Sequence, residues 1–178
     1  MDASPREKPV RALILAVWVL GSSGIAAQTV LLRELLVLFG GNEFSIGMIL
    51  GAWVIAEAAG AFLAGFWARR ASHAAAVFIA LTALFCILFP ASIYAARVFK
   101  ILAGIPQGMG VGLVTIVWTS LLLLLPTGLV HGLLFIFACR LHAQTASGGA
   151  GSTGRVYFQE TLGTIVGGLL ATYLFRPY

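Results

Sequence analysis

Long apolar runs separated by short polar stretches dominate the chain. Runs of about 20 residues recur along it, and about 20 residues of helix span the 30 Å hydrocarbon core of a bilayer. Because backbone polar groups cannot stay unpaired in lipid, such runs are expected to be helices. The pattern predicts one helix that begins near residue 12, followed by helices over residues 44–67, 74–96, 102–125, 126–141 and 156–175.

The boundary at Pro126 is the least distinct, because "SLLLLLPTGLVHGLLF" contains no polar turn. Proline is tolerated as the first residue of a helix, where its missing N–H costs no hydrogen bond. On that basis we predict six transmembrane helices. The alternative is a single kinked helix over residues 111–139, which would reduce the count to five.

The polar ends of the runs indicate the domain organisation and the topology. Residues 1–11 are predicted to form a cytoplasmic tail, since three basic residues precede the first helix and favour its N-terminus inside. With six spans, both termini would be cytoplasmic. Residues 12–178 form one transmembrane domain, and the Gly/Ser-rich stretch at 142–155 is predicted to be a flexible loop.

Composition agrees with this class of protein. Hydrophobic residues make up 60% of the 178 residues and charged residues only 10%, whereas a soluble domain has about a quarter charged residues. The sequence therefore predicts an all-α, polytopic integral membrane helix bundle. Its expected partner is the surrounding lipid bilayer. The net charge of +5 is spread over termini and loops, which argues against nucleic acid. No pattern typical of a catalytic residue, a metal site or a cofactor site occurs.

Small residues recur at four-residue spacing, which lets helices approach closely in lipid. This spacing predicts helix contacts rather than chemistry. The sets are Gly47/Gly51, Ala56/Gly60/Ala64, Gly104/Gly108/Gly112 and Gly163/Gly167.

Glu57 is the most unusual single residue, because it lies near the middle of the helix predicted over 44–67. A charged residue at the bilayer centre costs roughly 2.5–3.5 kcal/mol on insertion scales. Trp53, Gly60 and Ala64 share its helical face, so the side chain is expected to point into a helix contact. Two interpretations stay open: a carboxylate that handles protons or cations, with Arg33 as the first candidate partner, or a neutral, hydrogen-bonded structural glutamic acid.

A second polar cluster lies in "AQTVLLRELLVLFGGNE", residues 27–43. Its charges are expected at a membrane boundary, where arginine can extend towards water. They are either interfacial anchors and helix caps, or parts of a polar site where the first two helices meet. Together with polar residues of later helices, the candidate site residues are Gln28, Arg33, Glu34, Asn42, Glu43, Glu57, His131 and Glu160.

Two stretches, residues 23–70 and 154–175, resemble the membrane region of bacterial spermidine synthase-like membrane proteins. The residues that match the pattern are Gln28, Leu32, Arg33, Glu34, Gly41, Asn42, Glu43, Gly47, Gly60, Tyr157, Glu160 and Gly163. The resemblance implies a multi-helix membrane region that is often followed by a soluble aminopropyltransferase-like domain. It also allows a half-major-facilitator-like bundle, although "GFWARR" lacks the Asp usual in that fold.

The resemblance does not carry enzyme activity to this chain, because no aminopropyltransferase-like segment occurs in the 178 residues. We expect a non-catalytic module of the bacterial inner membrane that anchors or handles a polyamine-like substrate for a soluble synthase-like partner. The alternative is a small transporter or membrane-complex subunit that forms a homo-oligomer.

Overall fold

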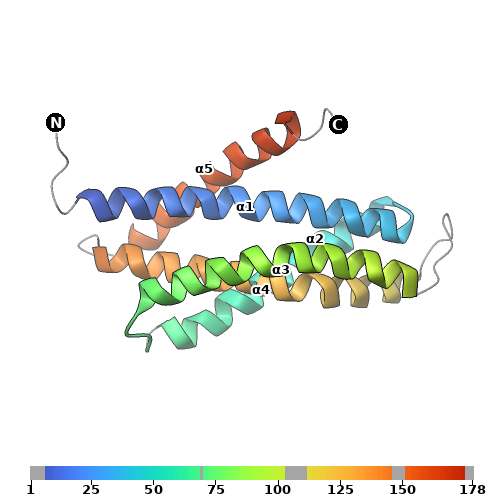
Figure 1. Cartoon of the computed structure of the whole chain (residues 1–178), viewed down its shortest axis with the longest axis horizontal. Helices are drawn as coiled ribbons and strands as arrows, with labels where there is room; N and C mark the ends of the chain where they lie inside the picture. The colour runs from blue at the N-terminus through green and yellow to red at the C-terminus, as the bar shows by residue number, and fades with distance from the viewer. Residues whose placement is uncertain (1–6, 69, 103–111, 146–150, 175–178) are drawn as a thin grey trace.

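Helices joined by short turns make up the described part of the chain. The computed structural model describes residues 7–68, 70–102, 112–145 and 151–174. Within these ranges the chain forms a bundle of helices (Figure 1), and the all-α prediction is confirmed. The elements are α1 (Glu7–Phe39), α2 (Glu43–Ala68), α3 (Ala74–Leu102), α4 (Leu113–Thr145) and α5 (Gly151–Leu174).

Four of these helices are long and apolar enough to cross a membrane, judged by length and composition. The spans are Val10–Phe39 in α1, all of α2, Ala74–Phe99 in α3 and all of α4. The shorter α5 carries more polar residues and is not one of the four. The predicted membrane-type helix bundle is therefore seen, but six spans are not.

The prediction of a helix boundary at Pro126 is wrong, since Pro126 lies inside the 33-residue α4. A proline inside a helix removes one backbone hydrogen bond, and apolar helices tolerate this where neighbouring helices pack around the site. Here the flanking residues are held on two sides. Thr127 exchanges a buried hydrogen bond with Ser92 of α3, at 2.8 Å between the two hydroxyl oxygens, and Gly128 packs against Ala56 of α2.

Three other predicted boundaries also differ. Helix α1 begins at Glu7, inside the predicted tail 1–11, and tolerates Pro9 because the first turn needs no N–H donor there. The predicted loop 142–155 is helical at both ends, which leaves only residues 146–150, outside the described residues, between α4 and α5. Within the helix predicted over 102–125, residues 103–111 also lie outside the described ranges, and α4 begins at Leu113.

Helix α4 forms the centre of the bundle and carries the longest run of buried residues. Helices α1 and α3 run in one direction, α2 and α4 run in the opposite direction, and α5 crosses α1 diagonally (Figure 1). Helix α5 begins near the end of the bundle where α1 begins and rises away from the other helices towards its own end (Figure 1).

Two helix crossings bring backbone against backbone through glycine. Where α2 meets α4, Gly60 lies on the backbone of Leu129 and Gly132 lies on the carbonyl of Glu57. An added Cβ on either residue would collide with main-chain atoms. The predicted role of Gly60 in helix contact is therefore confirmed.

The second glycine crossing joins α1 to α5. Gly21 lies on the backbone of Glu160, and Gly163 lies on the backbone of Trp18. Ser22 donates a hydrogen bond to the carbonyl of Gly163 at 2.7 Å. Gly163 confirms the packing prediction, and Gly167, close to Ser22, does so as well.

Three other glycines of these sets make no contact with another helix among the described residues. A Cβ added at Gly47, Gly51 or Gly112 would meet no atom within 4 Å. Within the described part of the chain the prediction of helix contacts is therefore wrong for these glycines, because spacing shows only that a face is small and not which face the neighbouring helix covers. Gly104 and Gly108 lie outside the described residues.

Candidate functional site

A polar cleft of about 300 Å³ opens between the two glycine crossings. It is set in a bundle whose core is otherwise mostly apolar. Its walls come from α1, α2, α4 and α5, and they include four of the predicted site residues: Gln28, Glu57, His131 and Glu160. The remaining lining residues are Gly24, Ile25, Trp53, Tyr157, Thr161 and Thr164.

The glycines of the crossings place the functional side chains. Gly132, the residue after His131 on α4, lets this helix approach the backbone of Glu57. Gly21 does the same for α5 at the backbone of Glu160. Gly24 leaves room for the His131 ring, since a Cβ there would collide with the imidazole. Glycine has a low helix propensity, but at these positions it allows the side chains of Glu57, His131 and Glu160 to approach one cleft.

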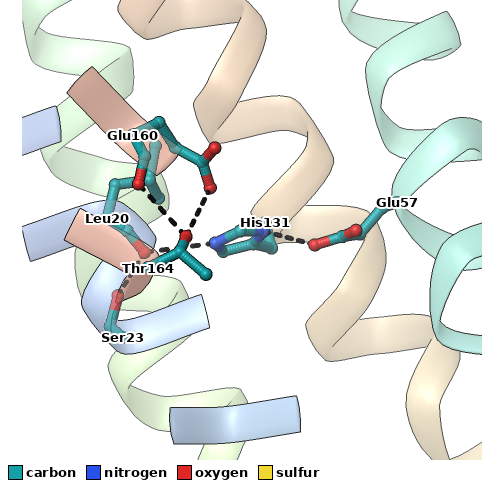
Figure 2. Close-up of polar contacts among 6 residues, drawn as sticks. All are labelled: Leu20, Ser23, Glu57, His131, Glu160 and Thr164. Atoms are coloured by element: carbon teal, nitrogen blue, oxygen red, sulfur yellow. Dashed lines mark hydrogen bonds and ion pairs between the residues drawn. The ribbon is translucent and has the colours of Figure 1, made fainter. Parts of the chain in front are cut away.

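Glu57 and His131 form the closest polar pair in the cleft. His131 Nδ1 lies 2.6 Å from Glu57 Oε1, and the side chains are 8% and 32% exposed respectively. The other ring nitrogen, Nε2, lies 3.3 Å from the carbonyl oxygen of Leu20. Figure 2 shows the ring between Glu57 on one side and Leu20 on the other. The expectation that Glu57 points into a helix contact is therefore confirmed, but its partner is His131 rather than Arg33.

Aromatic rings surround the imidazole on its remaining sides. The ring centroid of Phe85, on α3, lies 5.7 Å from that of His131, and the centroid of Trp53, on α2, lies 6.1 Å away. These rings keep α3 and α2 packed against His131, while the Glu57 carboxylate retains its contact with the cleft.

Glu160 enters the same cleft from α5 and is partly buried. Thr164, one turn later, donates to the Glu160 carbonyl at 3.1 Å and lies 3.4 Å from its carboxylate oxygen Oε1. In Figure 2 Glu160 lies on the side of the His131 ring away from Glu57. The cleft therefore has an acidic group on each side of one histidine.

Hydrogen bonds between α1 and α5 stabilise the wall that carries Glu160. Trp18 Nε1 donates to Gln159 Oε1 at 2.6 Å, one residue before Glu160. With the Ser22 hydrogen bond to Gly163, this contact binds α5 to α1 on both sides of the carboxylate.

Sequence reasoning missed several cleft residues. Thr164 could have been found from its position four residues after Glu160, which places both on one helical face. Tyr157 precedes Glu160 by three residues and follows the same rule. Gly24 gave no distinguishing signal, because its role depends on where α4 places His131.

The remaining four candidate residues do not join the cleft. Asn42 is the N-cap of α2, since its Oδ1 accepts hydrogen bonds from the Ser45 amide at 2.7 Å and the Ser45 hydroxyl at 2.8 Å. Glu43 is exposed in the first turn of α2, where a negative charge suits the helix dipole. For these two residues the capping interpretation is correct.

Arg33 and Glu34 also lie away from the cleft. Glu34 accepts two hydrogen bonds from Arg97 of α3, at 2.6 and 3.1 Å, a partner that the sequence did not indicate. Arg33 is exposed and borders a mainly apolar groove near the end of α1. The contacts of the described residues therefore do not support the alternative of one polar site where the first two helices meet, because Glu34 pairs with α3 while Arg33 is exposed.

Within the described ranges, no group of three or more His, Cys, Asp or Glu side chains is placed to hold a metal ion. No protein family, curated protein or solved structure matches this chain. The geometry of the cleft is consequently the main guide to function.

Proposed function

We propose that this chain is a membrane-embedded helical module that binds a polyamine-like organic cation in the cleft between α1, α2, α4 and α5. The observation that carries the proposal is the presence of two glutamates, Glu57 and Glu160, on one cleft of about 300 Å³ in an apolar bundle. Glu57 lies in α2, one of the four helices long and apolar enough to cross a membrane, and acidic side chains within such segments are costly and usually mark a substrate or ion pathway.

The other lining groups suit an alkyl ammonium ligand. Trp53 and Tyr157 supply aromatic faces, which attract ammonium groups through the ring quadrupole. Gln28 and Thr161 add oxygen atoms that accept N–H hydrogen bonds. The volume is at the small end of ligand pockets, which favours a short linear diamine over a larger ligand.

The choice of a polyamine and the expected role as a module also follow the resemblance of residues 23–70 and 154–175 to spermidine synthase-like membrane proteins. On this proposal the chain resides in a bacterial inner membrane and holds the cation for a soluble synthase-like partner. The chain alone is expected to transfer no aminopropyl group to putrescine.

Calorimetry of the purified chain in lipid nanodiscs, with putrescine and spermidine as probes, tests the proposal. Glu160→Gln removes one charge and is expected to weaken binding at least tenfold, about 1.4 kcal/mol, in the range of one charged hydrogen bond. Glu43→Gln is the matched control, because Glu43 is exposed outside the cleft and should leave affinity unchanged. Absence of binding of both amines to the unmodified chain would refute the proposed function.

A transporter or complex subunit that forms a homo-oligomer is the second candidate. The outer face of α2 favours it, since Gly47 and Gly51 are exposed and a Cβ added at either would meet no atom of another helix within 4 Å. In lipid, small residues four apart allow a second helix to approach closely. Gly51→Leu should then reduce both the oligomer mass in nanodiscs and putrescine uptake into vesicles. A monomeric chain that takes up no putrescine would exclude this candidate.

A further inference from the structure

We infer that the cleft exchanges a proton for its cation: the bound cation takes the place at Glu57 that the His131 Nδ1 proton occupies in the empty cleft. This inference rests on the proposed function and adds to it how binding is coupled to pH. It follows from the contacts of the two ring nitrogens and from the partial exposure of Glu57.

Both nitrogens of His131 face oxygen acceptors. Nδ1 is 2.6 Å from the Glu57 carboxyl and Nε2 is 3.3 Å from the Leu20 carbonyl. A carbonyl oxygen can only accept, so Nε2 carries a hydrogen. Nδ1 then shares a second proton with Glu57. The empty cleft therefore holds one proton between the histidine and the glutamate.

The carbonyl of Leu20 decides which proton can leave. A neutral imidazole has one N–H and one bare nitrogen. While Nε2–H donates to Leu20, the neutral ring must be bare at Nδ1, on the side of Glu57. Loss of the Nδ1 proton thus leaves the ring in place with its other hydrogen bond intact.

Each helix packed around His131 contributes a defined group. Helix α2 contributes Glu57, and α5 contributes Glu160 and the phenol of Tyr157 to the same cleft. Helix α3 presents the Phe85 ring, and α1 presents the Leu20 carbonyl and Gly24. Among the described side chains of the cleft, His131 is the group that can carry positive charge.

Glu57 belongs to both the pair and the cleft. Its side chain is 32% exposed whereas that of His131 is 8% exposed, so an ammonium group can reach the carboxylate from the cleft without displacing the ring. Two positive charges a few ångströms apart repel strongly where water is scarce. The arriving cation therefore favours the neutral ring.

Charge and atoms balance in the exchange. The Glu57 carboxylate with the His131 imidazolium, together with one ammonium group, becomes the carboxylate–ammonium pair, a neutral His131 and one proton released to solvent. The N–H bond at Nδ1 breaks, and its electron pair stays on the ring nitrogen. Glu160 retains its contact with Thr164 and takes no part in the transfer.

Calorimetry with putrescine in two buffers of different ionisation enthalpy, at one pH, measures the protons released. Putrescine keeps its charge near pH 7, because alkyl ammonium groups titrate near 10. The unmodified chain should release about one proton per ammonium group that reaches Glu57. Because binding releases a proton, repeating the titration at lower pH should lower the affinity by up to about tenfold per pH unit. His131→Gln should bind putrescine with no release and no such pH dependence, while Glu160→Gln should bind more weakly with the release unchanged.

Nitrogen NMR of the unmodified chain provides a second readout if His131→Gln does not fold. Three histidines are present, and His73→Gln, at an exposed position, simplifies assignment. The Nδ1 signal of His131 should change from protonated to bare when putrescine is added. Binding without proton release, or release that persists in His131→Gln, would overturn the exchange while leaving the proposed function intact. No binding at all would overturn both.

Discussion

Two pairs, each of a glutamate and a basic side chain, have the same length but lie in different surroundings. The Glu57–His131 pair joins α2 to α4, and the Glu34–Arg97 pair joins α1 to α3, each with a closest N–O distance of 2.6 Å. The histidine is 8% exposed and Arg97 is 66% exposed. The distance alone therefore does not distinguish a candidate site from a surface contact.

The neighbouring backbone makes the difference. Around the inner pair, Gly60 and Gly132 bring two main chains into contact, so the side chains have few other positions. The outer pair lies near the C-terminal ends of α1 and α3, which run in the same direction (Figure 1), and its long arginine reaches Glu34 across the surface. Burial and backbone contact, more than charge, therefore distinguish the inner pair from the outer pair.

The largest effect is expected when the glycine contact itself is filled. In Gly132→Leu the new Cβ would collide with the carbonyl oxygen of Glu57 and would lie 2.9 Å from the amide nitrogen of Ala61. Since both are main-chain atoms, α2 and α4 must separate. We expect a loss of about 3 kcal/mol, at the upper end for overpacking, measured by unfolding in mild detergent.

Gly65→Leu is the matched control on α2. A Cβ at Gly65 meets no atom within 4 Å, and replacing glycine by leucine favours the helix by roughly 0.5–1 kcal/mol. This variant should be as stable as the unmodified chain or slightly more so. Equal losses in both variants would contradict the importance of the α2–α4 contact.

The positions of the helices could be predicted from the sequence better than the number of helices. Apolar runs identify α2 and the start of α3 closely, because hydrophobicity stops at polar residues there, but α3 continues past its predicted end at residue 96 to Leu102. At Pro126 the local rules allow either a helix start or a kink. In the structure Ser92 and Ala56 contact the residues after Pro126, where one continuous helix forms. Both are remote from Pro126 in the sequence and are neighbours only in the folded chain.

Disruption of the inner pair should have the next largest effect. His131→Leu leaves Glu57 without its imidazole partner. Removing one partner of a buried pair typically costs 3–5 kcal/mol. We expect about 2 kcal/mol here, because the Glu57 side chain is 32% exposed and retains access to the cleft. Chemical unfolding in detergent measures the loss.

A second substitution separates charge from packing. Glu57→Gln in the His131→Leu background removes the carboxylate and should restore part of the lost stability. A double-mutant cycle with both single variants gives the coupling energy between the two side chains. A coupling close to zero would contradict the view that the inner pair stabilises the α2–α4 contact.

The candidate site could be predicted only in part, for a physical reason. Glu57, His131 and Glu160 are conspicuous because polar residues in apolar helices are costly. Their convergence depends on helix order around α4 and on rotations that hydrophobic patterns leave undetermined, since these helices are apolar on nearly all sides. Arg33 and Glu34 were equally conspicuous, and only the structure shows that Glu34 contacts Arg97 instead of the cleft.

The smallest effect is expected at the outer pair. Arg97→Gln removes two hydrogen bonds to Glu34, but an exposed ion pair contributes little to stability, since water screens the charges and the long side chain loses entropy when it is held. We expect this variant to show the smallest shift in unfolding of the variants compared, in 0.1 M salt. The shift should approach zero near 1 M salt, where the screening length falls to about 3 Å. The stability of Arg97→Lys should lie between that of the unmodified chain and that of Arg97→Gln, because lysine keeps the charge without the two-pronged contact. A loss from Arg97→Gln that equals the loss from His131→Leu would contradict the comparison, since it would show that exposure does not separate the two pairs.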